Sequence, residues 1–212
     1  MEQPKEVALL KVAGVVDESH QRGGPMDETV VPALLDDDVV AVQTWSQRST
    51  TSLEDRAAAA SGSTALIMAA RAGSVGALRA LIDLGADVDA VTDDGATALM
   101  VSAQNGHSEC VRLLIEARAD VNARTEVHAA TALHLACREG HISCARQLAE
   151  AGAALNDVVK TSELFANGAT ALTFAVFHSY REIEFILRQI GAPDAPLTRD
   201  AFRSAVEWRE RF

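Results

Sequence analysis

Apolar and small residues recur along the chain with the period of an α-helix, in short runs that stop at turn-forming residues. From Thr64 to Ala72 they make one continuous helical face, and Gly73 follows as a residue that tolerates a left-handed backbone. A second run, Val75 to Leu84, places Leu78 and Leu81 on one stripe and also ends at a glycine. The pattern predicts two short helices joined by a turn.

The same helix-turn-helix pattern occurs four times. The tripeptide Thr-Ala-Leu recurs at spacings of 33, 34 and 39 residues, beginning at Thr64, Thr97, Thr131 and Thr170. Each unit also has a turn residue nine positions after that threonine, a leucine eight positions further on, and a small closing pair. In order these are Gly73, Gly106, Gly140 and Ser179; Leu81, Leu114, Leu148 and Leu187; Gly85-Ala86, Arg118-Ala119, Gly152-Ala153 and Gly191-Ala192. Such a period predicts an array of stacked units rather than a fold built around one catalytic centre.

Short segments between the units predict hairpin-like loops. Ala86 to Ala96 contains Asp94-Gly95, a tight-turn signal. The connector from Leu155 to Ala169 is about five residues longer than its counterparts, so we expect that loop to be extended or mobile. A tetratricopeptide array has a similar period, but its longer helices would not tolerate a glycine and a turn signal in every unit.

These units resemble the ankyrin repeats. The best match is ATALHLACREG, from Ala130 to Gly140, continued to Asn156, and the unit from Gly95 to Asn122 is nearly as close. The resemblance covers about residues 61 to 192, although alanine replaces the family's proline after each threonine. Upstream, residues 28 to 47 fit the same apolar columns, with Asp37 in place of the glycine, which indicates a degenerate first unit.

The resemblance implies an all-α solenoid of stacked helix-turn-helix units with hairpin-like loops. We expect a loose N-terminal arm over residues 1–27, a degenerate N-terminal repeat or cap over 28–60, and four repeats over 61–193. The repeats span about 61–93, 94–127, 128–166 and 167–193. Residues 194–212 are expected to form a C-terminal capping helix, because Ala201, Phe202, Ala205 and Trp208 share one helical face.

Charge and cysteine content restrict the partners and the compartment. The formal net charge is −11, which disfavours nucleic acid and anionic membrane surfaces as direct partners. Three cysteines, an odd number, without a recognisable secretory signal indicate a reducing compartment. We expect a monomer in the cytoplasm, with the nucleus as an alternative.

The sequence has no recognisable catalytic or cofactor motif. It lacks a Gly-x-Ser-x-Gly elbow, a GxxxxGK phosphate loop, a GxGxxG motif after a strand and an HExxH motif. We therefore expect no enzyme activity and no cofactor.

A metal site is the strongest chemical alternative, because HxxC occurs three times, at His107/Cys110, His134/Cys137 and His141/Cys144. His107 and His141 occupy the same position in successive units, so the repeat itself produces two of these motifs. Units about 10 Å apart cannot share one zinc ion, whose ligands lie at about 2.0–2.3 Å. We expect no metal site and read the cysteines as small buried hydrophobes. By resemblance to the family, His134 is structural and binds the backbone of an adjacent loop.

Acidic residues gather in two places. Asp36, Asp37 and Asp38 lie in the degenerate unit, and five more surround the first good loop: Asp83, Asp87, Asp89, Asp93 and Asp94. One interpretation is a solubilising end of the array. The alternative is a patch that steers a basic protein partner toward the array.

By resemblance, ankyrin arrays bind proteins with loop tips and with the concave face of the first helices. Carried onto this sequence, the candidate contact residues are Arg71, Asp93, Asp94, Gln104, Asn105, Val127, His128, Arg138, Glu139, Asn167, Phe177 and His178, with Ser61, Ser63, Ala96, Ala130 and Ala169 beside them. Phe177 stands out, because the other units have polar residues in its column. It is either a contact anchor or a core residue packed against the C-terminal stretch.

The sequence therefore predicts a non-catalytic protein-interaction module, a scaffold or adaptor that holds protein partners with its loops and concave groove. The alternative is a regulatory or targeting segment of a larger enzyme or signalling protein.

Overall fold

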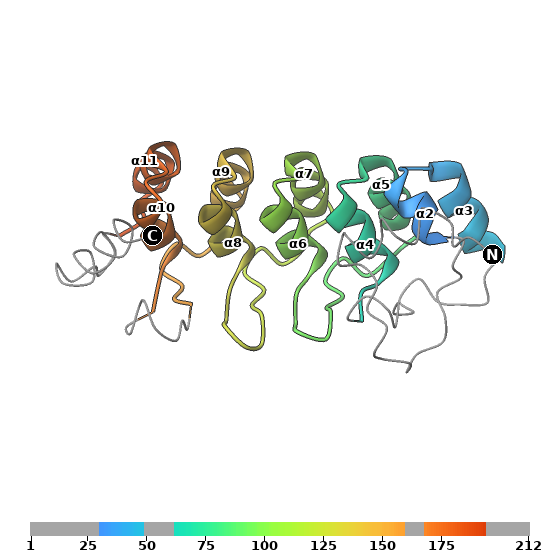
Figure 1. The fold of residues 1–212 in the computed structure, drawn as a ribbon, viewed down its shortest axis with the longest axis horizontal. Helices are drawn as coiled ribbons and strands as arrows, with labels where there is room; N and C mark the ends of the chain where they lie inside the picture. Colours follow the sequence, from blue (N-terminus) through green and yellow to red (C-terminus); the bar gives the residue numbers. More distant parts are fainter. Residues whose placement is uncertain (1–29, 49–61, 160–167, 194–212) are drawn as a thin grey trace, which may run out of the picture.

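The computed structural model describes residues 30–48, 62–159 and 168–193, which form ten α-helices in consecutive pairs. The pairs are α2 (Val30–Leu35) and α3 (Val39–Arg48), α4 (Ala65–Ala72) and α5 (Val75–Asp83), α6 (Ala98–Asn105) and α7 (Ser108–Glu116), α8 (Ala132–Glu139) and α9 (Ile142–Glu150), and α10 (Ala171–Phe177) and α11 (Arg181–Gln189). Figure 1 shows the pairs side by side along the long axis, with the first helices in one row and the second helices in another. The all-α repeat fold expected from the sequence is confirmed.

The repeated threonine and glycine fix the ends of the first helix in each unit. The hydroxyl oxygens of Thr64, Thr97 and Thr170 each accept a hydrogen bond from the backbone N–H three residues on, at 3.4, 3.3 and 3.2 Å. The turn position has a left-handed backbone in all five described units: φ is 58° at Asp37, 75° at Gly73, 77° at Gly106, 83° at Gly140 and 61° at Ser179. The turn role predicted for Asp37 in the degenerate unit is therefore confirmed.

A continuous hydrophobic core runs through the described helices from α2 to α11. The repeated leucines lie at its centre and are 0% exposed at Leu81, Leu114, Leu148 and Leu187. Buried alanines in every first helix from α4 to α10 let neighbouring units approach closely. Helices of seven to nine residues are marginal alone, so this stacking supplies their stability.

The residue after each turn links its unit to the preceding one. Ser74 Oγ donates to the carbonyl of Leu35 at 3.4 Å, and the Nε2 atoms of His107 and His141 lie 3.1 and 2.9 Å from the carbonyls of Arg71 and Gln104. A carbonyl only accepts, so these histidines carry their hydrogen on Nε2. In the last unit Tyr180 takes this position, and its ring lies against Gly140, where a β-carbon would be 2.7 Å from Tyr180 Cζ.

Three loops project from the array, and we call them finger 1 (residues 86–96), finger 2 (residues 119–130) and finger 3 (the described residues 153–159 and 168–169). Finger 1 closes with an antiparallel bridge between Val91 and Thr97 and turns at Gly95, whose φ is 79°. In finger 2 the N–H of Thr125 donates to the carbonyl of Ala130 at 3.0 Å. The hairpin-like loop predicted around Asp94-Gly95 is confirmed.

Side-chain hydrogen bonds join the fingers to one another. Asp89 Oδ1 accepts from the N–H of Asp120 at 2.8 Å, and Asn122 Oδ1 accepts from the N–H of Ala154 at 2.7 Å. The two acceptors occupy the same column of successive units, so the repeat also sets the spacing of the fingers.

The last described unit has a polar end face. Glu184 and Arg188 form an i,i+4 ion pair at 3.1 Å. In the preceding units these two columns hold apolar residues: Leu78, Val111 and Ala145, and Ile82, Ile115 and Ala149. The predicted N-terminal arm, the predicted C-terminal helix and residues 160–167 of the connector that we expect to be extended or mobile lie outside the described residues.

Candidate functional site

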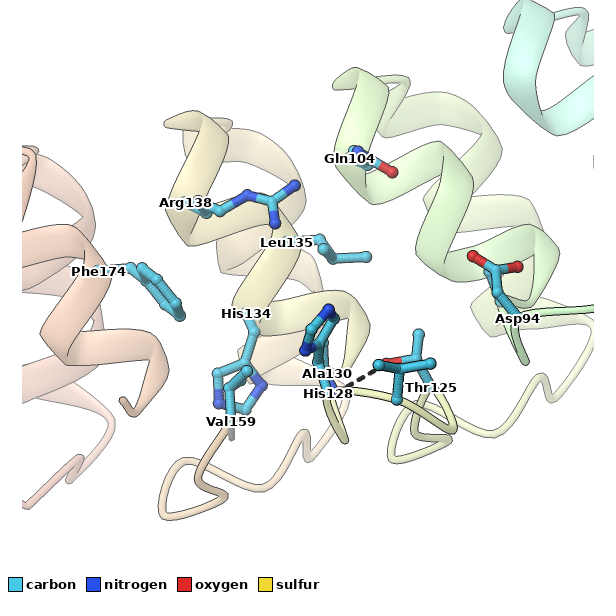
Figure 2. A pocket seen from close by; sticks show the side chains of 12 residues that line it. Asp94, Gln104, Thr125, His128, Ala130, His134, Leu135, Arg138, Val159 and Phe174 are labelled. Atoms are coloured by element: carbon cyan, nitrogen blue, oxygen red, sulfur yellow. Dashed lines mark hydrogen bonds between the residues drawn. The ribbon is translucent and has the colours of Figure 1, made fainter. Parts of the chain in front are cut away.

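An open groove of about 480 Å³ lies along the first helices, beside the fingers (Figure 2). α6 contributes one wall, α8 crosses the centre, and α10 contributes the far end. Twelve residues line it: Asp94, Ala96, Gln104, Thr125, Val127, His128, Ala130, His134, Leu135, Arg138, Val159 and Phe174.

Five residues that the sequence nominated for contact lie in this groove. They are Asp94, Gln104, Val127, His128 and Arg138, drawn from finger 1, α6, finger 2 and α8. All five side chains are exposed, and Val127 is 67% exposed although it is apolar. Ala96 and Ala130, named beside them, also line the groove. The repeat columns therefore bring together residues that are up to 44 positions apart in sequence.

The other described candidates do not line the groove. Arg71 lies in the last turn of α4 and Asn105 ends α6, and Asn105 Nδ2 donates to the carbonyl of Arg71 at 3.4 Å. Asp93 is exposed in finger 1, and Glu139 pairs with Arg138 at 2.8 Å. Asn167 and Ser61 lie outside the described residues.

The aromatic cluster expected around Phe177 forms at the end of α10. The Phe177 and His178 rings meet edge to face, with centroids 4.9 Å apart, and His178 stacks on Tyr180 at 5.5 Å. Phe177 is half-buried and packs against the hydrophobic core.

Sequence reasoning missed the apolar floor of the groove. Leu135 and Phe174 are 9% and 8% exposed and occupy the same column, four residues after the repeated threonine. Met68 and Val101 precede them in that column and are also buried. The column looks like ordinary core in the sequence. Its one distinguishing signal is the phenylalanine in the last unit.

His134 is structural, as expected. Its Nδ1 lies 2.8 Å from the hydroxyl of Thr131 and 3.3 Å from that residue's backbone N, which closes a capping box at the start of α8. Its Nε2 lies 2.9 Å from the carbonyl of Asp157 in finger 3. Burial lowers the pKa of His134 below its ordinary value, and the contact with Asp157 opposes this shift. The side chain therefore ties α8 to the next finger in its neutral form.

The HxxC pairs do not form metal sites within the described residues. His107 and His141 precede their helices and contact backbone carbonyls, whereas Cys110 and Cys144 are buried in the core. Burial raises the pKa of these two thiols to about 11 and that of Cys137 to about 12. Among the residues that the structure describes, no group of three or more His, Cys, Asp or Glu side chains could hold a metal ion.

The rim of the groove offers hydrogen-bonding groups that are not used elsewhere. Arg138 donates through Nε to Glu139, and its two Nη nitrogens make no hydrogen bond to described residues. The Gln104 amide and the His128 ring likewise have no partner in the described part of the chain. These groups surround the apolar floor, an arrangement suited to holding a peptide.

A row of stacked helix pairs with an open groove beside projecting loops defines a repeat solenoid. The chain belongs to the ankyrin-repeat family, since the family model described as ankyrin repeats (3 copies) matches residues 29–125 and 125–194. A comparison with individual curated proteins gave no match. Ankyrin repeats are in general protein–protein interaction modules, and such domains are typically non-catalytic. None of the helices in residues 30–48, 62–159 and 168–193 is long and apolar enough to cross a membrane.

Proposed function

We propose that this chain is a non-catalytic scaffold or adaptor that holds a protein partner in the groove between α6, α8, α10 and the fingers. One observation carries the proposal: five contact candidates, identified by resemblance to the family, lie around one groove with an apolar floor.

The groove combines the two features that a peptide-binding surface needs. Leu135 and Phe174 offer apolar area to a buried side chain, and such anchors supply most of the energy in many interfaces. Arg138, Gln104 and His128 offer hydrogen-bonding groups that fix the orientation of the bound chain.

The acids around finger 1 support a basic partner. Asp87, Asp89, Asp93 and Asp94 are all exposed, and a patch of one sign accelerates association with a chain of opposite sign. If steering operates, the association rate constant falls by about tenfold or more between 0.02 and 0.5 M salt. A rate constant that does not change with salt would leave these acids with a solubilising role only.

Partner capture from the source cells tests the proposal with two matched triple variants. The groove variant replaces Val127, His128 and Arg138 with alanine. The control replaces Arg79, Ser143 and Glu150, which are equally exposed but lie on the second helices. A specific partner should be captured by the wild type and by the control, and its Kd should weaken about tenfold or more with the groove variant.

Equal loss of the partner from both variants, or from neither, would contradict the proposed site. Failure to recover a specific partner, together with substrate turnover by the purified chain, would contradict the function itself.

A further inference from the structure

The groove has opposite charges at its finger 1 end and on α8, at its centre. Asp94 is exposed at the end formed by finger 1, and the backbone N–H of Glu126 donates to the Asp94 carbonyl at 3.4 Å, which places a second acidic residue beside it. Arg138 lies on α8, with its guanidinium at the rim (Figure 2). A bound chain of complementary charge is therefore basic where it passes finger 1 and acidic where it passes Arg138.

An apolar floor separates these charges. Leu135 lies on α8 one helical turn before Arg138, and Figure 2 shows its side chain directed toward α6. Ala96 and Ala130 extend the floor beneath the fingers and, being small, leave space above them. Between Asp94 and Arg138 the groove therefore offers apolar surface to a side chain of a bound segment.

The repeat sets the spacing of the two charges. Asp94 lies in finger 1, four residues before α6, and Arg138 is the seventh residue of α8, so they belong to adjacent units. Neighbouring helices pack about 10 Å apart, and the position of Arg138 along α8 adds about 9 Å at 1.5 Å per residue. The two charges are therefore about 13 Å apart, and because an extended chain advances about 3.3 Å per residue, the complementary charges on a bound segment are about four residues apart.

We infer that the groove takes an extended segment of a partner protein carrying a basic residue, an apolar residue and an acidic residue, in that order from finger 1 to α8. This inference rests on the proposed function. The basic side chain meets Asp94, the apolar one lies on Leu135, and the carboxylate meets the Nη nitrogens of Arg138, whose geometry matches a carboxylate. The Arg138–Glu139 ion pair is exposed, so it contributes little free energy. A partner carboxylate that competes with Glu139 for Arg138 therefore costs the folded protein little stability.

A displayed library of random linear twelve-residue peptides tests this chemistry without knowledge of the natural partner. Selection on the wild type should enrich peptides with opposite charges about four residues apart and an apolar residue between them. Selection on Asp94→Arg should replace the basic residue with an acidic one. Selection on Arg138→Glu should replace the acidic residue with a basic one.

Two controls separate specific from general charge effects. Asp83→Arg and Arg79→Glu make the same changes on exposed positions of α5, outside the groove, and should leave the selected pattern unchanged. Asp94→Asn removes the charge but keeps an oxygen for the Thr92 hydroxyl that bonds Asp94, so it should lose the basic preference without gaining an acidic one. For the best wild-type peptide, each charge reversal in the groove should weaken Kd about tenfold or more.

The possible failures are distinct. Enriched peptides that bind the wild type and both groove reversals equally would overturn the charge pattern and leave groove binding intact. An absence of enrichment on the wild type would overturn both this inference and the proposed function.

Discussion

Ala129 holds a left-handed backbone that a glycine would adopt without strain. Its φ is 53°, and the same position in the other described units is Gly62, Gly95 and Gly168, with φ of 70°, 79° and 81°. An L residue in this region costs about 1–2 kcal/mol, because its β-carbon crowds the neighbouring carbonyl oxygen. Ala129→Gly should therefore stabilise the protein.

Two smaller effects oppose the gain. Glycine makes the unfolded chain more flexible, which costs about 0.4–1 kcal/mol. The change also removes the half-buried methyl group of Ala129. One fully buried methylene stabilises a protein by about 0.8 kcal/mol, so the loss of this methyl group costs a few tenths of that value. The net expectation is a stabilisation of about 0.6 kcal/mol, and a rise in Tm of about 1–2 °C for a chain of this size.

Urea unfolding followed by circular dichroism at 222 nm measures this change. Arg118→Gly provides a second, independent case, because Arg118 is exposed with φ of 65° where other units have Gly85, Gly152 and Gly191. Its midpoint should also rise. The reverse change, Gly95→Ala, introduces the strain and places a β-carbon 3.0 Å from the backbone N of Glu126, so it should lower the midpoint.

The reasoning is refuted if Ala129→Gly lowers the urea midpoint at an unchanged slope. It is also refuted if Gly95→Ala leaves the midpoint unchanged, since strain at this column would then carry no energy.

Three further predictions concern buried groups. Ser102→Ala should raise the free energy of unfolding by about 1 kcal/mol, measured by urea unfolding, because the Ser102 hydroxyl is fully buried and has no hydrogen-bond partner among the described residues. The same column holds Ala69, Ala136 and Ala175, and a loss of stability would contradict this prediction. His134→Thr should keep the capping box, as Thr173 does with Thr170, but cost about 1 kcal/mol by removing the link to Asp157. Because the folded-state pKa of His134 is lowered, the unfolded chain binds more protons, so wild-type stability should fall as the pH drops below about 6.5. Thermal scans from pH 8 to 5 should show a smaller fall in His134→Thr, and equal slopes would contradict the assignment. Burial raises the pKa of Cys110 and Cys144 to about 11 and that of Cys137 to about 12, so these thiols should not react with Ellman's reagent in the native protein at pH 8. All three should react in urea. Rapid labelling of the native protein would contradict this prediction and show that the core opens.

The fold was predictable because one sequence pattern controls both ends of each first helix. The threonine supplies a hydroxyl for the first turn, and the glycine nine residues on takes the left-handed backbone. The same pattern also predicted that Asp37 takes the turn position of the first unit, although it is not a glycine. Its carboxylate also accepts from the N–H of Ala77 at 2.7 Å, a contact between units that no local pattern indicates.

The candidate site was predictable where its residues lie at the loop and helix positions that the family resemblance assigns to contact. Gln104, Val127 and Arg138 occupy such positions and line the groove. Leu135 and Phe174 were not predicted, because a column that is nearly buried in every unit is read as core. Which part of that column remains open depends on the path of the fingers, and the sequence does not determine it directly.

The sequence also did not predict the hydrogen bonds that His107 and His141 make. Both were recognised as repeated residues, but their partners are the backbone carbonyls of Arg71 and Gln104. Every residue has a carbonyl, so a sequence contains no signal for which one is bound.

The hydrogen bonds between units determine where a further repeat could be added to this array. Ser74, His107 and His141 each bind a carbonyl of the preceding unit, so a duplicated copy of residues 97–130 inserted before α8 would find a matching acceptor on one side and a matching donor on the other. The groove would lengthen by one unit without new interfaces. A unit stacked instead on α11 would have to bury the Glu184–Arg188 ion pair, and burial of charge is costly. Duplication of an internal repeat therefore needs no other substitutions, whereas a repeat added after α11 would first require apolar replacements at Glu184 and Arg188.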